Sequence, residues 1–355
     1  MFSWIFFNSF KIFLDGKLIG SFNGTHETRQ VYQKVHLEKD RPAALKIEYS
    51  HRARMARMHL LWKKPAADSL ERAVEAARKA EATVLFLGLS PRLEGEEMNV
   101  EITGFKGGDR LTLDLPANQE KLLEEVAKAA AGKPVVLVLL NGSPLAVNQA
   151  VELVPAIVEA WYPGQAAGQA IADVLFGDYN PAGRLPVTFY KSADDLPDFS
   201  DYLMAGRTYR YFKKEPLFPF GYGLSYTSFS YSKLSTPKSL KAGEELTVSV
   251  EVKNTGRRDG EEVVEFYLSR PDSASPVNPL RWLAAYKRLF LRAGEKQKVT
   301  LTVRPQELAS YDAAGNRVIE AGRLIVSAGG QQPGFAGRLS APTTGVLTAE
   351  IKIKR

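Results

Sequence analysis

Cysteine is absent from the 355-residue sequence, and histidine is scarce. Without cysteine the chain has no disulfide bonds, no thiolate metal site and no cysteine nucleophile. The four histidines are His26, His36, His51 and His59, and their spacing matches no metal motif such as H-E-x-x-H. We therefore expect no metal site and interpret the histidines as surface or packed side chains.

Phosphate-binding loops and long charged or apolar runs are also missing. No G-x-G-x-x-G or G-x-x-x-x-G-K-S/T string occurs, so the common nucleotide-binding motifs are excluded. The net charge is +7, but Lys and Arg are spread along the chain. We interpret this charge as a solvated surface and expect no nucleic-acid binding. The apolar start MFSWIFFNSF is too short to span a membrane. We expect no membrane span and interpret this start as the cut edge of a larger protein rather than a stray extension.

An all-β module is predicted for residues 1–64. The segment KIFLDGKLIGSF places Asp15-Gly16 between two alternating runs, which is a strong signal for a hairpin. Three further strand-like runs follow, namely QVYQKVHLE, AALKIEYSH and RMHLLWK.

The hydrophobic period changes in residues 65–230, where strands alternate with helices. The apolar runs TVLFLGLS, VVLVLLNG and AIVEAWY are typical of buried strands, and helical patterns lie between them. This alternation predicts a parallel sheet in an α/β layer. Sites in such sheets lie at the carboxyl ends of the strands. The segments LSPRLEGEE, NGSP and WYPGQ leave strands at that edge, so we expect the chemistry there.

Alternating strands return in residues 231–335. ELTVSVEVKNTG, EEVVEFYLSR, QKVTLTVRP and RLIVSAGG are separated by turns at short intervals, which predicts a β-sandwich with its own core. Residues 336–355 form a tail whose end, TGVLTAEIKIKR, fits either another strand or a loose end.

Long strings in these regions resemble one enzyme family. WYPGQAAGQAIADVLFGDYNPAGRLPVTFY, YLMAGRTYRYF and PLFPFGYGLSYTSFSYS closely resemble the α/β sandwich domain of glycoside hydrolase family 3. The next region resembles the fibronectin type III-like domain of such enzymes. The stretch from FLDGKLIGSF to YSHRARMARMHLLWKKP resembles the end of an anthrax protective-antigen-type module that some members carry as an insertion. The resemblance covers about 330 of the 355 residues. It implies a multidomain α/β plus all-β protein, with a partial β-module, an α/β sandwich with a parallel sheet, and a fibronectin type III-like β-sandwich.

The resemblance also implies that a part is missing. Family members begin with a (β/α)₈-type barrel that carries the nucleophile, an Asp in an S-D-W-like strand end. No S-D-W string occurs here, and Ser200-Asp201-Tyr202 is only a superficial match. We therefore expect no nucleophile in this chain and no activity without a barrel, which a separate gene could encode.

The second catalytic carboxyl group of the family, the general acid/base, lies on a loop that matches GLSPRLEGEEMNVEITGFKGGDR. Retaining glycosidases need two carboxyl groups about 5–5.5 Å apart. The loop offers Glu94, Glu96, Glu97 and Glu101, and crowded like charges favour the protonated form that an acid needs. Glu94 follows the SPRL turn, where matching loops carry the acid. It is our first candidate, before Glu97 and Glu96.

Other residues at this edge have weaker signals. Asp109 and Arg110 close the loop after a Gly-Gly pair that permits sharp turns, and we expect them to contact substrate or to form a structural ion pair within the loop. Ser143 is not in a G-x-S-x-G elbow, and no histidine follows His59, so we expect no serine nucleophile. We expect the aromatic segments GRTYRYF and FGYGLSYT to pin a linker between domains rather than to stack on sugars.

The sequence thus predicts part of a retaining, exo-acting β-glucosidase or β-xylosidase that acts on the terminal β-linked sugar of an oligosaccharide or glycoside. The resemblance implies no metal and no organic cofactor, and a periplasmic or secreted parent enzyme. A non-catalytic carbohydrate-binding or scaffold protein is the alternative, and half of a split enzyme is a third possibility.

Overall fold

The computed structural model describes residues 2–7, 9–24, 28–38, 40–50, 57–62, 68–98, 100, 102–273, 275 and 278–355. The chain divides into two compact units, Met1–Ala73 and Val74–Arg355, and each is described by itself. His26, His51 and Glu101 lie outside the described residues, whereas His36 and His59 are exposed.

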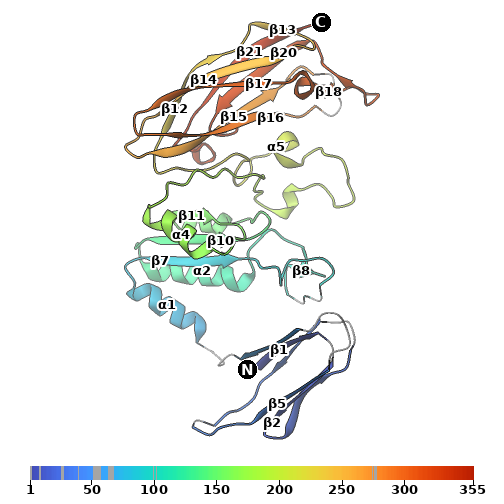
Figure 1. The fold of residues 1–355 in the computed structure, drawn as a ribbon, viewed down its shortest axis with the longest axis vertical. Helices are drawn as coiled ribbons and strands as arrows, with labels where there is room; N and C mark the ends of the chain where they lie inside the picture. Colours follow the sequence, from blue (N-terminus) through green and yellow to red (C-terminus); the bar gives the residue numbers. More distant parts are fainter. Residues whose placement is uncertain are drawn as a thin grey trace. The chain divides into compact units, whose positions relative to one another are not determined.

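The first unit contains two antiparallel sheets, with strand orders β4-β1-β6 and β3-β2-β5 (Figure 1). The strands are β1 (Phe2–Phe7), β2 (Ser9–Leu14), β3 (Lys17–Phe22), β4 (Thr28–Gln33), β5 (Leu45–Ser50) and β6 (Arg57–Trp62). Asp15 and Gly16 have φ values of 48° and 81°, as a type I′ turn requires, and they join β2 to β3. The predicted hairpin is confirmed. The apolar start of the chain is the central strand β1, which pairs with both β4 and β6.

The second unit begins with the predicted parallel sheet, of strand order β11-β10-β7. The elements in chain order are α1 (Ser69–Lys79), β7 (Thr83–Gly88), β8 (Phe105–Lys106), β9 (Asp109–Arg110), α2 (Ala117–Ala130), β10 (Val135–Leu140), α3 (Asn148–Leu153), β11 (Ala156–Glu159) and α4 (Ala167–Phe176). Helix α1 crosses the boundary between the two units. In Figure 1 helix α2 lies beside β7, against which it packs. The buried run of β10 packs in the centre, which explains why it shows no alternation.

A connecting region leads from α4 to the β-sandwich and contains η1 (Ala193–Asp195) and α5 (Thr208–Tyr211). Its aromatic rings pack on one another, as for Tyr209 and Phe220, whose ring centroids are 4.1 Å apart. The Tyr209 hydroxyl accepts a hydrogen bond from the Leu283 amide of the sandwich at 3.1 Å. These rings therefore fasten the connecting region to the sandwich, the role that we expected for them.

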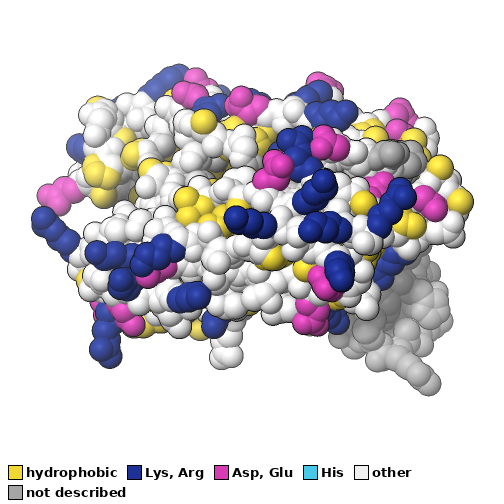
Figure 2. All heavy atoms as spheres, turned by 90° about the horizontal axis from the view of Figure 1, so that it is seen from above, with side chains coloured by type: hydrophobic (Ala, Val, Ile, Leu, Met, Phe, Trp, Pro, Cys, Tyr) yellow, Lys and Arg dark blue, Asp and Glu magenta, His cyan; other side chains and the backbone are white. Residues whose placement is uncertain are grey.

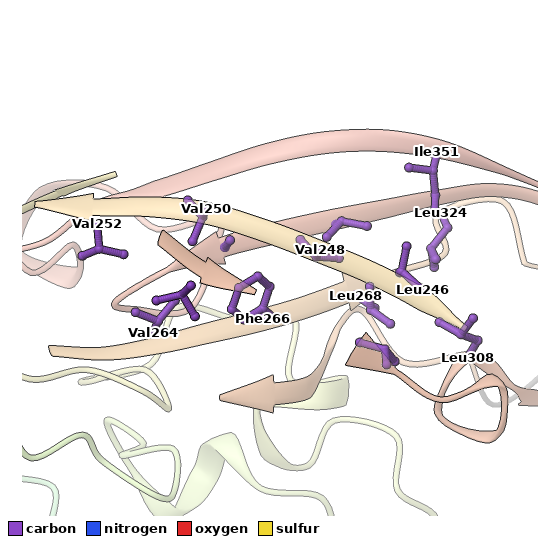
Figure 3. Packing of buried hydrophobic residues seen from close by; sticks show 14 of the residues in the cluster. Leu246, Val248, Val250, Val252, Val264, Phe266, Leu268, Leu308, Leu324 and Ile351 are labelled. Carbon is purple, nitrogen blue, oxygen red and sulfur yellow. The ribbon is translucent and has the colours of Figure 1, made fainter. Parts of the chain in front are cut away.

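The β-sandwich consists of one sheet of order β12-β14-β17 and one of order β13-β21-β20-β15-β16. Its elements are β12 (Phe229–Ser235), β13 (Ser239–Lys241), β14 (Leu246–Asn254), β15 (Gly260–Ser269), β16 (Trp282–Leu291), β17 (Lys296–Val303), η2 (Pro305–Leu308), β18 (Ser310–Tyr311), β19 (Arg317–Val318), β20 (Gly322–Gly329), η3 (Gly337–Leu339) and β21 (Val346–Lys354). Alternate side chains of facing strands fill the space between the sheets, as Val250 and Phe266 do in Figure 3.

The last residues of the chain belong to this sandwich. Strand β21 pairs with β20 along eight positions, and its Ile351 and Ile353 are buried in the core. Of the two alternatives for the end of the tail, the structure therefore has the strand. We propose 229–354 as the bounds of this domain, in place of the predicted 231–335 followed by a tail of 336–355.

Charged side chains of both signs are mixed on the face that Figure 2 draws. On the face drawn in Figure 2, Lys and Arg are scattered with Asp and Glu between them rather than gathered in one patch. This is the distribution of a solvated surface. No helix in the described part of the chain has both the length and the apolar character needed to cross a bilayer.

A buried carboxyl group in the sandwich makes stability depend on pH. Glu265 is 3% exposed, and burial raises its pKa from 4.5 to about 7, although the Tyr267 hydroxyl donates a hydrogen bond to it at 2.8 Å. Between about pH 4.5 and 7, Glu265 is therefore protonated in the folded chain and ionised in the unfolded chain. The contribution of Glu265 to the free energy of unfolding is therefore largest below about pH 4.5, and it falls as the pH rises to about 7.

Glu265→Gln copies the protonated side chain and should remove this loss. We expect the variant to be more stable than the wild type by about 1–3 kcal/mol at pH 8 and nearly equal to it at pH 5, measured by urea unfolding at both values. Glu245→Gln, at an exposed position, is the control and should show no pH-dependent difference. An equal change at both pH values would contradict a proton held by Glu265.

Candidate active site

At the carboxyl end of the parallel sheet, the chain leaves β7 through a turn that only glycine can form. Gly88 has a φ of 145°, and a Cβ atom there would lie 2.0 Å from the carbonyl oxygen of Leu140 on β10. Only glycine fits this close approach. The Gln119 side chain of α2 both donates to and accepts from the Gly88 backbone, at 2.8 and 2.7 Å. The loop that carries the glutamates therefore leaves the sheet in a fixed direction.

Glu94 is held by the neighbouring strand end. The loop turns at Ser90, whose carbonyl accepts from the Glu94 amide at 3.1 Å. The Ser143 hydroxyl, beyond β10, donates to Glu94 Oε1 at 2.5 Å. Arg110 Nη1 in turn donates to Ser143 Oγ at 2.8 Å and to the Pro144 carbonyl at 2.7 Å. Two hydrogen bonds in series thus run from Arg110 through Ser143 to the half-buried Glu94 carboxylate.

Arg110 is an anchor for this loop. Its Nε donates to the Thr112 carbonyl at 3.2 Å, and its buried Nη2 has no hydrogen-bond partner among the described residues. Burial lowers the pKa of Arg110, and the nearby charge of Glu94 opposes that shift. Asp109, its neighbour in β9, is exposed. The structure therefore has Arg110 bonded to backbone and Ser143, and no ion pair is recorded between Asp109 and Arg110 in the described part of the loop.

The two alternate glutamates lie outside this arrangement. Glu96 and Glu97 are exposed, and Glu97 has a φ of 50°. The loop closes through Gly108, where a Cβ atom would lie 1.8 Å from the Gly95 carbonyl oxygen. The Gly-Gly pair that permits a sharp turn thus lies where a side chain would collide with the backbone. In the closed loop Glu94 is half-buried beside the sheet, whereas Glu96 and Glu97 are exposed to solvent.

A second carboxyl group, Glu159 at the end of β11, was not anticipated. It accepts from the Trp161 amide at 3.0 Å and from Asn141 Nδ2 at 3.3 Å. Burial raises its pKa from 4.5 to about 7. Asn141 Nδ2 also donates to the Ser143 carbonyl at 3.0 Å. Asn141 thus links the end of β11 to the segment that carries Ser143 after β10. The only sequence signal was an acidic residue closing the apolar run before WYPGQ.

Two aromatic residues complete this edge. Trp161 has a φ of 54°, and its ring packs edge-on against Phe189 at 6.0 Å. Tyr162 lies over Gly142, where a Cβ atom would lie 2.8 Å from the tyrosine ring. Burial raises the pKa of Tyr162, and the charge of Glu94 adds to this shift. Tyr162 is 43% exposed, so it can contact a molecule at Glu94.

The remaining nucleophile candidate, Asp201, has a local structural role. Its Oδ1 accepts from the Leu203 amide at 2.9 Å, and its carbonyl accepts from Arg207. Both contacts stabilise the exposed loop around it, which is how Asp commonly serves in turns.

Comparison with known proteins gives the family. The family model described as glycosyl hydrolase family 3 C-terminal domain matches residues 16–226, more than half of the chain. The chain belongs to glycosyl hydrolase family 3. A second model, for the fibronectin type III-like domain, matches residues 262–332 within the sandwich. The predicted resemblance to family 3 and to its fibronectin type III-like domain is confirmed, as is the fold class.

Similar members of family 3 are xylosidases and glucosidases. The chain is 47% identical to a xylan 1,4-beta-xylosidase of Xylanibacter ruminicola over 229 residues, which are 64% of this chain and 26% of that protein. It is 37% identical to a periplasmic beta-glucosidase of Salmonella typhimurium over 274 residues, 73% of this chain and 34% of that protein. The crystal structure of a beta-glucosidase from Kluyveromyces marxianus in complex with glucose matches with a TM-score of 0.79 and 27% identity, covering 100% of this chain and 42% of that one. The family 3 chain thus spans well under half the length of these relatives.

Proposed function

We propose that this chain supplies the general acid/base of a retaining, exo-acting β-glycosidase, with Glu94 as the group that transfers the proton. The observation that carries the proposal is the short hydrogen bond from Ser143 to Glu94 at the edge where three parallel strands end. This bond fixes one carboxylate oxygen, and the other oxygen would carry the proton to the substrate. Glu97 and Glu96, the alternates, are exposed.

Hydrolysis would need a nucleophile on the opposite side of the anomeric carbon, about 5–5.5 Å from Glu94. Glu94 would protonate the departing oxygen and then remove a proton from the incoming water. Ser143 donates a hydrogen bond to Glu94 and so holds the side chain in one orientation for both steps. Arg110 positions Ser143, and Asp109, which is exposed beside it, is the further candidate for contact with sugar hydroxyls.

The substrate class that we propose is a glycoside or oligosaccharide with a terminal β-linked glucose or xylose. Support comes from the relatives, which are named beta-glucosidases and xylosidases. A periplasmic or secreted location is proposed on the same ground, because one relative is named periplasmic. We also propose that the first unit, with its antiparallel sheets, is the end of a protective-antigen-type module.

The family's nucleophile would come from a barrel, in the same chain or in a partner. We expect these 355 residues alone to give no turnover of aryl β-glucosides or β-xylosides above buffer, and a family 3 barrel supplied with them to restore it. The measurement is the release of nitrophenol with and without the barrel. A saturable rate from the chain alone would contradict this picture. If Asp201→Ala abolished that rate, Asp201 would be the nucleophile, and if the rate survived, the chemistry would not depend on a barrel.

A non-catalytic carbohydrate-binding function is the second candidate. The observation that favours it is that Asp201, the nucleophile candidate, accepts a hydrogen bond from the Leu203 amide and so stabilises its own exposed loop. Failure of every matched barrel to restore turnover, with sugar binding intact, would favour this candidate over the first.

A further inference from the structure

Beside the sandwich, away from the residues that hold Glu94, lies a pocket of about 640 Å³. It is lined by residues 177–180, which follow α4, by residues 257–261, which lead into β15, and by Phe290 of β16. Its volume is within the range of ordinary small-molecule sites. The pocket therefore lies where the α/β part and the sandwich meet within the second unit.

Two exposed aromatic side chains, Phe290 in the pocket lining and Tyr286 beyond it, form a row along β16. Strand β16 is the edge strand of its sheet (Figure 1). Tyr286 and Phe290 are 66% and 55% exposed. They stand four residues apart on one face of a regular stretch of strand, so their Cα atoms are separated by about 13 Å. Exposed rings in a straight row are poor for solubility but well suited to stacking on a ligand.

Polar groups beside the row are held in place. Arg288, between the two rings, donates to the Tyr179 hydroxyl at 2.7 Å and forms an ion pair with Glu261. Tyr179 also donates to Glu261 at 3.1 Å. Phe290 lies directly opposite Glu261 in the pairing of β16 with β15. Planar hydrogen-bonding groups thus stand in fixed positions beside an exposed ring.

The charges around the pocket balance. Three acids and three bases line or border it, namely Asp178, Asp259, Glu261, Arg257, Arg258 and Arg288. An anionic or cationic ligand would find no excess of opposite charge here, whereas a neutral ligand rich in hydroxyls would find both donors and acceptors.

We propose that this pocket and the aromatic row of Tyr286 and Phe290 form a non-catalytic binding site for a neutral, β-linked oligosaccharide. A pyranose ring offers an apolar face for stacking and hydroxyls at its edge, which matches rings flanked by arginine and carboxylate. The length of the row suits several sugars of an extended chain rather than one. The site shares no residue with the candidate active site, so it goes beyond the proposed function, and only the β-linkage of its ligand rests on that function.

The test is calorimetric titration of the 355-residue chain with xylohexaose and with cellohexaose. We expect saturable binding of at least one of them, and about tenfold or greater weakening in Phe290→Ala and in Tyr286→Ala, since each removes a stacking surface. Phe199→Ala is the matched control, because Phe199 is 95% exposed in a loop outside this site, and it should keep the affinity of the wild type. Circular dichroism verifies that all three variants are folded.

Three results would overturn the site. One is the absence of binding by the wild-type chain, and another is unchanged affinity in both aromatic variants. The third is a concentration-dependent dimer in sedimentation that Phe290→Ala dissolves while sugar binding is absent, because the row would then be a contact between copies. Tighter binding of polygalacturonate than of either neutral hexamer would overturn the neutral-ligand assignment.

Discussion

In a complete family 3 enzyme built on this chain, Glu94→Gln is expected to slow the hydrolysis of glycosides with poor leaving groups by about 10²- to 10⁴-fold. Gln has the shape of Glu and can still accept the hydrogen bond from Ser143, so the loop should keep its geometry. It cannot deliver a proton to the departing oxygen. An alcohol or sugar leaving group needs that proton, whereas dinitrophenolate leaves almost without it.

The measurement is therefore a comparison of leaving groups. The glycosylation step should be nearly unchanged for a dinitrophenyl glycoside and strongly slowed for a methyl glycoside or disaccharide. Added azide, which needs no base catalysis, should restore turnover of the dinitrophenyl glycoside. Glu96→Gln and Glu97→Gln are the matched controls, and we expect both to retain wild-type rates. Equal losses on good and poor leaving groups, or a larger loss in Glu97→Gln, would remove Glu94 from the role.

Of the substitutions proposed in the sandwich and its surroundings, Arg184→Ala should lower the free energy of unfolding most. The Arg184 side chain is 5% exposed and forms a 3.0 Å ion pair with Glu262, whose side chain is fully buried. The hydroxyls of Tyr231 and Thr344 donate to the other oxygen of Glu262, at 2.8 and 2.9 Å. Removing the arginine leaves a buried carboxylate without its counter-charge. The expected cost is about 3–5 kcal/mol in the free energy of unfolding.

Urea unfolding at two pH values tests this cost. Burial already raises the pKa of Glu262, with Arg184 as the main opposing charge, so losing Arg184 raises this pKa further. The folded variant then takes up a proton, and its defect should be smaller at pH 5 than at pH 8. Arg338→Ala, which breaks an exposed ion pair with Glu152 of the same 3.0 Å length, is the control and should cost no more than about 1 kcal/mol. A similar loss in both variants would contradict a special role for the buried pair.

Features that arise from neighbours in sequence were predictable. Asp15-Gly16 defines a hairpin because positive φ at both positions selects a type I′ turn. The apolar runs of β7, β10 and β11 indicate a parallel sheet, and parallel strands bring their carboxyl ends to one edge. The location of the candidate site at that edge, and Glu94 as the first choice for the acid, follow from pattern and family resemblance alone.

Features that depend on distant pairing were not predictable. The apolar start became the central strand β1 because of partners 21–31 and 50–60 positions away, and no local pattern separates such a strand from a loose end. Strand β21 entered the sandwich for the same reason. The sequence also could not rank Glu94, Glu96 and Glu97 by environment, because Ser143, which distinguishes Glu94, lies 49 residues from it.

The sequence by itself determined the hairpin at Asp15-Gly16, the strands of the parallel sheet and the edge of that sheet where chemistry is expected, because side-chain period and turn residues act over a few positions. Only the tertiary structure decided which carboxyl groups are held and which are buried. Glu94 on Ser143, Glu159 on Asn141 and Glu262 on Arg184 all depend on contacts between separate segments. Hydrogen-bond partners and burial, which set a carboxyl group's behaviour, exist only after the chain has folded.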